Sequence, residues 1–199
     1  TVVSGLPRTG TSLMMQILKA AGLPIFTDGA RAADESNQRG YYEHRRIGSL
    51  LGPGDHAWLG EARGLAVKVV APLLASLPRQ LPDPGQTDDK PTPVVYRVLF
   101  MDRDMDEILS SQRAFLGRLG EEAPSERGGD VAKAYLQQLR NARQWCQDPS
   151  VHGLAVSYET LVNRPDEILP QIAEFLRVPH KLPEMRACID PSLYRERKS

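Results

Sequence analysis

The predicted fold is organised around the segment Val2-Val3-Ser4-Gly5-Leu6-Pro7-Arg8-Thr9-Gly10-Thr11-Ser12. A short β-branched run leads into a glycine-containing turn, and an apolar helical repeat follows until Gly22, which is placed to end a helix. We therefore expect a strand over 1–4 and a helix over 10–21. The N–H groups of such a loop converge at the positive end of the helix dipole, so the stretch predicts a phosphate-binding cradle.

The length and composition indicate one α/β domain over residues 1–199. The 25 basic residues balance the 25 acidic residues, so the bulk charge favours no nucleic-acid partner. No run of 18 apolar residues is present, and we expect no membrane span. Cys146 and Cys188 are expected to be buried free thiols, which suits a reducing, cytoplasmic location.

Three further strands are expected to alternate with helices along the chain. The expected strands are 65–70, 94–101 and 153–158, and the expected helices are 45–51, 105–119, 130–146 and 166–176. Asp130 is expected to cap its helix, and Pro170 is expected in a first turn, where its missing N–H costs little. This alternation predicts a mostly parallel central sheet in a three-layer sandwich, with ligands bound beyond the carboxyl ends of the strands.

The first long connection is polar and rich in glycine. It runs through Thr27-Asp28-Gly29 and Asn37-Gln38-Arg39-Gly40 before Tyr41-Tyr42-Glu43-His44 closes it. Connections of this length are usually functional, so we expect a substrate flap at about 22–60.

The loop differs from the usual triphosphate loop, G-x-x-x-x-G-K-[ST], at one position. Gly5, Gly10 and Ser12 fit that pattern, but Thr11 stands where its lysine belongs. The basic residue lies inside the loop instead, at Arg8, and a guanidinium there can bind a phosphate with two hydrogen bonds. An ordinary tight turn with an exposed arginine is the plainer alternative.

Pro7-Arg8-Thr9-Gly10-Thr11-Ser12 resembles the phosphosulfate loop of the sulfotransferase family. The resemblance implies a P-loop NTPase-like fold and the donor 3′-phosphoadenosine 5′-phosphosulfate, with adenosine 3′,5′-bisphosphate as product and no metal. Arg103 and Ser111 are similar in spacing to the family's 3′-phosphate site. Tyr158, in a segment similar to the family's Tyr-Glu-Asp-Leu, is expected near the adenine.

The resemblance leaves the catalytic base open. Many family members have a histidine in a Lys-x-His-x-Pro corner, where this chain has Lys68-Val69-Val70-Ala71-Pro72. Glu43 is our candidate base, with a pKa expected to be raised by partial desolvation between two tyrosines, and His44 is its rival. Arg8 and Lys68 are expected to assist catalysis at the same site.

Two alternatives to a sulfotransferase stay open. A P-loop kinase is suggested by the apolar strand that ends at Asp102, a position suited to a magnesium-binding acid, although the loop lysine is missing. A non-catalytic nucleotide-binding relative is suggested by Val70. The acceptor is expected to be a small molecule or a glycan, and the sequence does not decide between a monomer and a homodimer.

Overall fold

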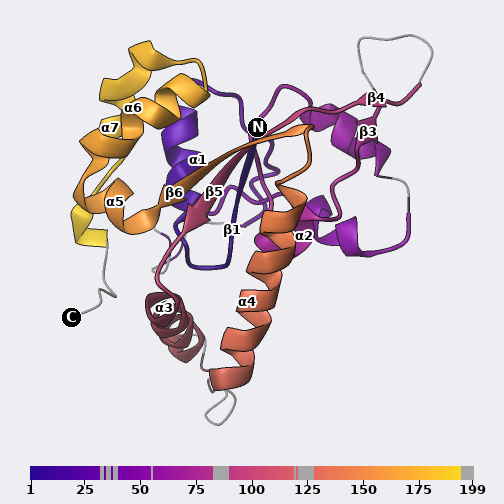
Figure 1. Cartoon of the computed structure of the whole chain (residues 1–199). Helices are drawn as coiled ribbons and strands as arrows, with labels where there is room; N and C mark the ends of the chain where they lie inside the picture. Colours follow the sequence, from indigo (N-terminus) through magenta and orange to yellow (C-terminus); the bar gives the residue numbers. More distant parts are fainter. Residues whose placement is uncertain are drawn as a thin grey trace.

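The computed structural model describes residues 1–31, 34, 37, 40–54, 56–82, 90–118, 120 and 128–193. A four-stranded, all-parallel sheet forms the centre, in the order β2-β1-β5-β6 (Figure 1). The strands are β1 (Val2–Gly5), β2 (Val67–Lys68), β5 (Tyr96–Asp102) and β6 (Val151–Ser157). The predicted parallel sheet is confirmed, and its register brings the carboxyl ends of the strands to one edge, because Gly5 pairs with Met101 and Asp102 with Ser157.

Helices cover both faces of the sheet (Figure 1). One face packs against α1 (Thr11–Ala20), α5 (Tyr158–Asn163), α6 (Pro165–Phe175) and α7 (Leu182–Ala187). The other packs against α2 (Ala71–Leu74), α4 (Gly128–Trp145) and the 3₁₀ helices η1 (Arg45–Leu51) and η2 (Ala57–Ala62). Alternate strand residues supply the two cores, with Leu99 facing α1 and Phe100 facing α2, as the period of two requires.

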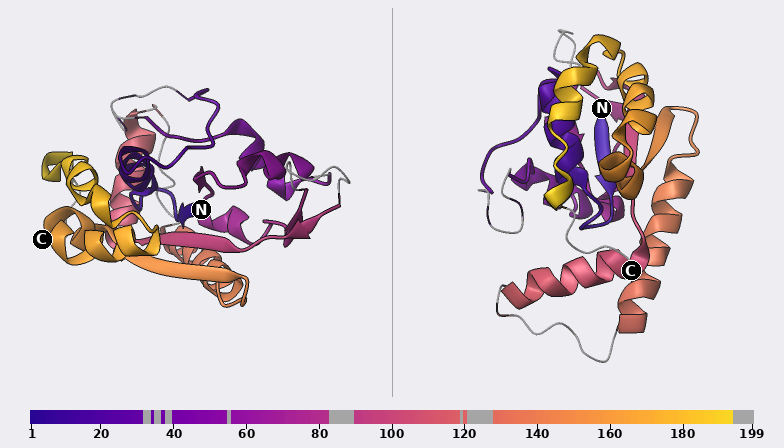
Figure 2. Two further views of the ribbon diagram at one scale, coloured as in Figure 1. Left: turned by 90° about the horizontal axis from the view of Figure 1, so that it is seen from above. Right: turned by 90° about the vertical axis from the view of Figure 1, so that its left-hand side faces the viewer.

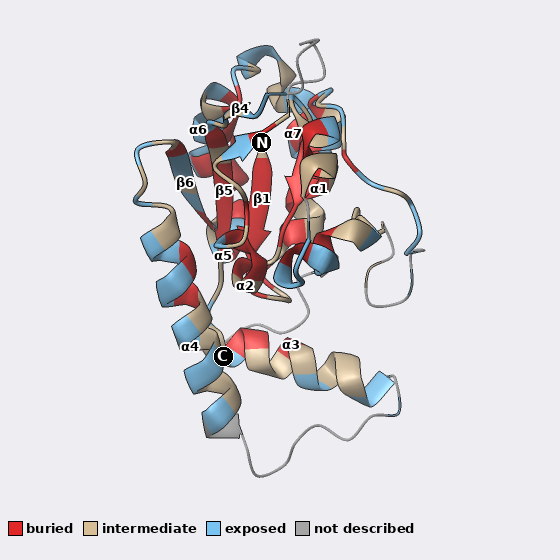
Figure 3. Cartoon of the chain, turned by 90° about the vertical axis from the view of Figure 1, so that its right-hand side faces the viewer, coloured by how far each residue is buried: buried red, intermediate tan, exposed pale blue. Residues whose placement is uncertain are grey.

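Helix α3 (Met105–Arg118) lies beyond the carboxyl ends of the strands (Figures 2 and 3). Its first half contributes Ile108 to the core, and its second half projects from the body. A small antiparallel pair, β3 (Gln80–Leu81) and β4 (Thr92–Pro93), stands apart from the main sheet. Two short 3₁₀ helices, η3 (Pro179–Lys181) and η4 (Pro191–Leu193), complete the described chain.

Four local predictions need correction. The strand expected over 65–70 shortens to β2, because Ala66 pairs with Ile25 on the outer side and Val70 already caps α2. Asp130 lies in the first turn of α4 rather than at its cap. Pro170 lies inside α6, beyond the first turn. The two cysteines are free, as expected, but only partly buried.

The end of α1 confirms the role assigned to Gly22. Gly22 has a left-handed φ of 84° and donates its N–H to the carbonyl of Lys19, while Leu23 donates to Leu18. These two hydrogen bonds form the Schellman motif, in which a glycine ends the helix without a side-chain clash. The turn directs the chain into the long connection that leads to Glu43. Within the described part of the chain, no helix is long and apolar enough to span a membrane.

Candidate anion-binding site at the carboxyl edge of the sheet

The loop between β1 and α1 has the backbone shape of an anion cradle. Arg8 and Gly10 both adopt left-handed backbone angles, with φ of 72° and 91°. A side chain at Gly10 would overlap the Tyr158 ring, and one at Gly5 would come within 2.7 Å of the Met101 carbonyl oxygen. Glycine is therefore required at both positions, because the Tyr158 ring and the Met101 backbone approach too closely for a Cβ.

Inside the loop, Thr9 holds the turn together. Its side chain is 1% exposed, and its hydroxyl donates to the carbonyl of Leu6 at 2.8 Å. Thr11 is buried as the first residue of α1, Ser12 follows it, and Pro7 is half-buried. Of the predicted loop residues, Thr9 thus acts on the loop itself, whereas the N–H groups at the start of α1 have no carbonyl partner within the helix.

The Arg8 side chain lies against α3. Its Nε donates to Ser111 Oγ at 3.1 Å, and its guanidinium carbon lies 5.2 Å from the centre of the Phe115 ring. Arg8 and Ser111, two of the predicted site residues, are therefore brought together across 103 positions of sequence, although the prediction paired Ser111 with Arg103. Ser111 orients the cradle arginine in this structure, which is a contact that the spacing argument did not anticipate.

Arg103 is enclosed between the loop, α3 and α5. Its Nε donates to Glu107 Oε2 at 2.9 Å, and its Nη1 donates to the backbone carbonyl of Arg8 at 2.9 Å. Its guanidinium carbon lies 4.7 Å from the centre of the Tyr158 ring. The Arg103 and Glu107 side chains are only 6% and 8% exposed. Sequence reasoning missed Glu107, although its spacing of four from Arg103 at the start of a helix is the pattern for an ion pair.

On the opposite side of the loop, Lys68 connects the cradle to the flap. The Lys68 Nζ lies 3.2 Å from Ser12 Oγ, 3.1 Å from the Tyr41 carbonyl oxygen and 3.0 Å from Glu43 Oε1. Burial lowers the pKa of Lys68, and the attraction of Glu43 only partly opposes this effect. Lys68 thus brings a cation from β2 to the cradle, where it contacts Ser12, the residue that follows Thr11.

Glu43 bridges two cations. Its second oxygen accepts from Arg31 Nη1 at 3.0 Å, and the Arg31 guanidinium stacks 3.5 Å from the centre of the Tyr41 ring. Burial pushes the pKa of Glu43 upward, but Lys68 and Arg31 outweigh it, and the net pKa lies below the ordinary value. The expectation of a raised pKa is therefore wrong, because Lys68 and Arg31, which both contact Tyr41, also pair with Glu43.

His44 has a structural role in the flap. Its ring stacks on Phe26 at 4.3 Å between centres and lies 6.0 Å from the Trp58 ring. Its Nδ1 accepts from the backbone N–H of Arg46 and so caps η1. These contacts favour Glu43 over His44 as the candidate base. At the family's histidine position, Val70 caps α2 and is partly buried.

Asp102 is engaged away from the loop. Its Oδ2 lies 3.4 Å from Arg143 Nη2 on α4, and its Oδ1 accepts from the backbone N–H of Arg103. Among the described residues, no group of three His, Cys, Asp or Glu side chains is arranged to hold a metal ion.

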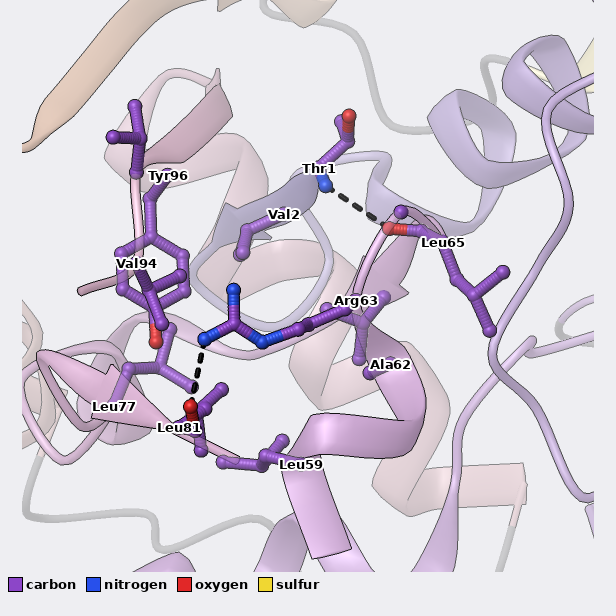
Figure 4. Close-up of a pocket in the computed structure, with 13 residues that line it drawn as sticks. Thr1, Val2, Leu59, Ala62, Arg63, Leu65, Leu77, Leu81, Val94 and Tyr96 are labelled. Carbon is purple, nitrogen blue, oxygen red and sulfur yellow. Dashed lines mark hydrogen bonds between the residues drawn. The ribbon is translucent and has the colours of Figure 1, made fainter. Parts of the chain in front are cut away.

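A cavity of about 140 Å³ lies elsewhere, at the amino-terminal ends of the strands (Figure 4). Its lining is mostly apolar, and its arginine, Arg63, donates to the carbonyls of Leu81, Pro82 and Thr92. Arg63 thereby ties η2 to the β3–β4 pair. Because parallel sheets bind ligands at their carboxyl edge, we assign this cavity no role in the candidate site.

No protein-family model matches the chain, and no curated protein matches it. The resemblance to sulfotransferases therefore rests on the motifs at Pro7–Ser12, Arg103, Ser111 and Tyr158. The structure brings all of these residues to one edge of the sheet, together with Lys68 and Glu43. Flap positions 32, 33, 35, 36, 38, 39 and 55 lie outside the described residues.

Proposed function

We propose that this chain transfers a sulfuryl group from 3′-phosphoadenosine 5′-phosphosulfate to a hydroxyl or amine acceptor, within a P-loop NTPase-like fold. One observation carries the proposal: the loop at the first strand–helix junction carries its own cation, Arg8, while Lys68 reaches its other side and bonds to Ser12. An anion bound there meets two cations and the N-terminus of α1. A conventional triphosphate loop has its lysine within the motif instead.

The residues at this edge fit such a donor. The phosphosulfate end would be held by the backbone of residues 8–12 and by the side chains of Arg8, Ser12 and Lys68. The nucleoside would extend toward Arg103, Ser111 and Tyr158. The bound donor supplies a sulfuryl group on a phosphate leaving group. Arginine, lysine and backbone N–H groups neutralise the charge that collects on that phosphate, so the reaction needs no metal ion.

Glu43 is positioned to remove the proton of the acceptor. Its lowered pKa keeps the carboxylate ionised at neutral pH, which a base requires, but also makes it a weak base. An anion bound beside Ser12 competes with Glu43 for Lys68, and its negative charge raises the pKa of Glu43. We therefore expect the carboxylate to become a stronger base once the cradle is filled.

The P-loop kinase alternative is weakened by Asp102. A magnesium-dependent kinase needs an acid at this strand end to hold the metal near the phosphates. Asp102 pairs instead with Arg143 of α4. The acceptor that we propose is a small molecule or a glycan, which enters under the flap beside Glu43 and Tyr41.

The proposal is tested by transfer of ³⁵S from labelled donor to a panel of phenols, sugars, amines and peptides, in the presence of EDTA. We expect labelled product with at least one acceptor, and about 10²- to 10³-fold less of it with the Arg8→Ala variant. Transfer of ³²P from magnesium ATP, with no ³⁵S transfer to any acceptor, would favour the kinase instead. Binding of the donor without any transfer would favour the non-catalytic relative.

A further inference from the structure

We propose that Glu107 is a positioning residue for the cradle: through Arg103, it holds the Arg8 carbonyl and thereby the anion-binding shape of the loop. The inference rests on the proposed function and deepens it. The resemblance to the sulfotransferase family implies that Arg103 of this chain contacts the 3′-phosphate of the donor. The structure gives this arginine a second task, which concerns the 5′ end of the donor.

The contacts form one connected path from α3 to the loop. Glu107 accepts from Arg103 Nε, and Arg103 Nη1 donates to the carbonyl of Arg8. Glu107 is itself fixed at the start of α3, where Asp104 Oδ1 accepts from the N–H groups of Asp106 and Glu107. The guanidinium of Arg103 is thus held at two of its nitrogens, by a side chain and by the loop backbone.

The loop needs such a brace because Arg8 has a left-handed backbone. A φ of 72° is unfavourable for a residue with a side chain and persists only where surrounding contacts impose it. A charged donor on the Arg8 carbonyl engages that oxygen, which would otherwise repel a bound anion. The Tyr158 ring closes the other side, between Arg103 and Gly10.

The negative charge of Glu107 allows the Arg103 guanidinium to be buried beside the loop. The two side chains are 6% and 8% exposed, and a single buried charge without its partner is strongly unfavourable. A neutral partner would leave the guanidinium less firmly oriented, because hydrogen bonds between charged groups are shorter and stronger than neutral ones. Glu107 therefore acts on the cradle through Arg103 and touches no substrate.

Positioning and direct ligation predict opposite results. If Arg103 only binds a 3′-phosphate, Glu107 competes with that phosphate, so removing the Glu107 charge leaves AMP binding unchanged and strengthens binding of adenosine 3′,5′-bisphosphate. If Glu107 positions the loop, removing its charge weakens the binding of both nucleotides, because both place a 5′-phosphate in the cradle. The ratio of the two affinities thus separates the two roles.

The experiment is calorimetric titration of AMP and of adenosine 3′,5′-bisphosphate into the full chain and its Glu107→Gln variant. We expect both affinities to fall by the same factor, about 5- to 10-fold, as the ion-pair hydrogen bond from Arg103 becomes a hydrogen bond to a neutral amide. Glu167→Gln is the matched control, since Glu167 forms an exposed ion pair with Arg164 on α6. This control is expected to change neither affinity.

A second variant covers the case in which Glu107→Gln does not fold. Arg103→Met with Glu107→Leu replaces the buried pair by apolar side chains, which proteins often tolerate, and we expect both nucleotides to bind at least 10-fold more weakly. Unchanged AMP affinity in either folded variant would overturn the positioning role. A wild-type chain that binds neither nucleotide would overturn the proposed function, and this inference with it.

Discussion

The two sides of the cradle are built differently. On the side of α3 and α5, Arg8, Arg103 and Glu107 are held by regular helices, and the central ion pair is less than 10% exposed. On the flap side, Lys68 is equally buried, but its partner Glu43 is 37% exposed and Arg31 is 43% exposed. In the described part of the flap that carries Glu43, the helices are the short 3₁₀ helices η1 and η2.

In the proposed reaction, this difference would separate donor binding from the chemistry at the acceptor. Groups that bind one fixed donor gain from being rigidly oriented before the donor binds. Groups that meet the acceptor benefit from a connection whose conformation and sequence can vary. Lys68 belongs to both sides, since it contacts Ser12 of the cradle and Glu43 of the flap. The comparison therefore predicts that substitutions on the flap side change turnover, while those on the α3 side change donor affinity.

Glu43→Gln gives the sharpest separation of the two sides. The amide keeps the shape of the side chain but cannot accept a proton at neutral pH, so we expect turnover to fall by about 10²- to 10⁴-fold. Donor affinity is expected to stay within a few-fold of the wild type. Steady-state kinetics and calorimetry measure these two quantities separately.

Glu61→Gln is the control for that substitution, because Glu61 forms an exposed ion pair with Arg46 next to the flap. It is expected to leave both quantities unchanged. Wild-type turnover in Glu43→Gln would remove Glu43 as the base.

Arg8→Ala tests the α3 side. It removes the charge and the bond to Ser111, and we expect donor affinity, turnover or both to fall by about 10²- to 10³-fold in all. Arg8→Lys is expected to recover only part of the loss, since lysine lacks the planar fork and the Nε donor. Arg140→Ala, which removes an exposed arginine of α4 bonded to Gln137, serves as the control. A lysine variant that is fully active would show that the charge alone matters.

Arg31→Ala predicts a smaller change, in the pH profile. If Glu43 is the base, as proposed, it must be ionised, so kcat/KM should fall as the pH drops through the pKa of that carboxyl, which lies below its ordinary value of 4.5. Arg31 is one cause of the lowering, so its removal should move the acid limb upward. The shift should stay below about one pH unit because the pair is partly exposed. A shift to lower pH would contradict the assigned coupling.

The sequence predicted those parts of the molecule that local pattern controls. The apolar runs located β1, β5 and β6, and the glycine loop located the start of α1. The β3–β4 pair was missed because it joins two-residue segments across a connection. Helix α5 was missed because Tyr158 continues the apolar pattern of β6, while Ser157 caps the new helix through Thr160.

At the site, residue identities were easier to predict than their contacts. The loop motif selected Arg8, and the resemblance of two further segments selected Arg103, Ser111 and Tyr158. These four residues do meet in space. The sign of the Glu43 pKa shift was predicted wrongly because it depends on Lys68 and Arg31, and Lys68 is 25 positions away in sequence. Pairings of this kind are set by the fold and leave no local pattern.

We propose that this loop binds a phosphosulfate-type nucleotide without a metal ion. Calorimetric titration of the wild-type chain with adenosine 3′,5′-bisphosphate in EDTA, and with ATP plus magnesium, tests it most directly. We predict micromolar or tighter binding of the bisphosphate without metal, and much weaker binding of magnesium ATP. Magnesium-dependent binding of ATP, with no detectable binding of the bisphosphate, would show instead that the loop is a conventional triphosphate site.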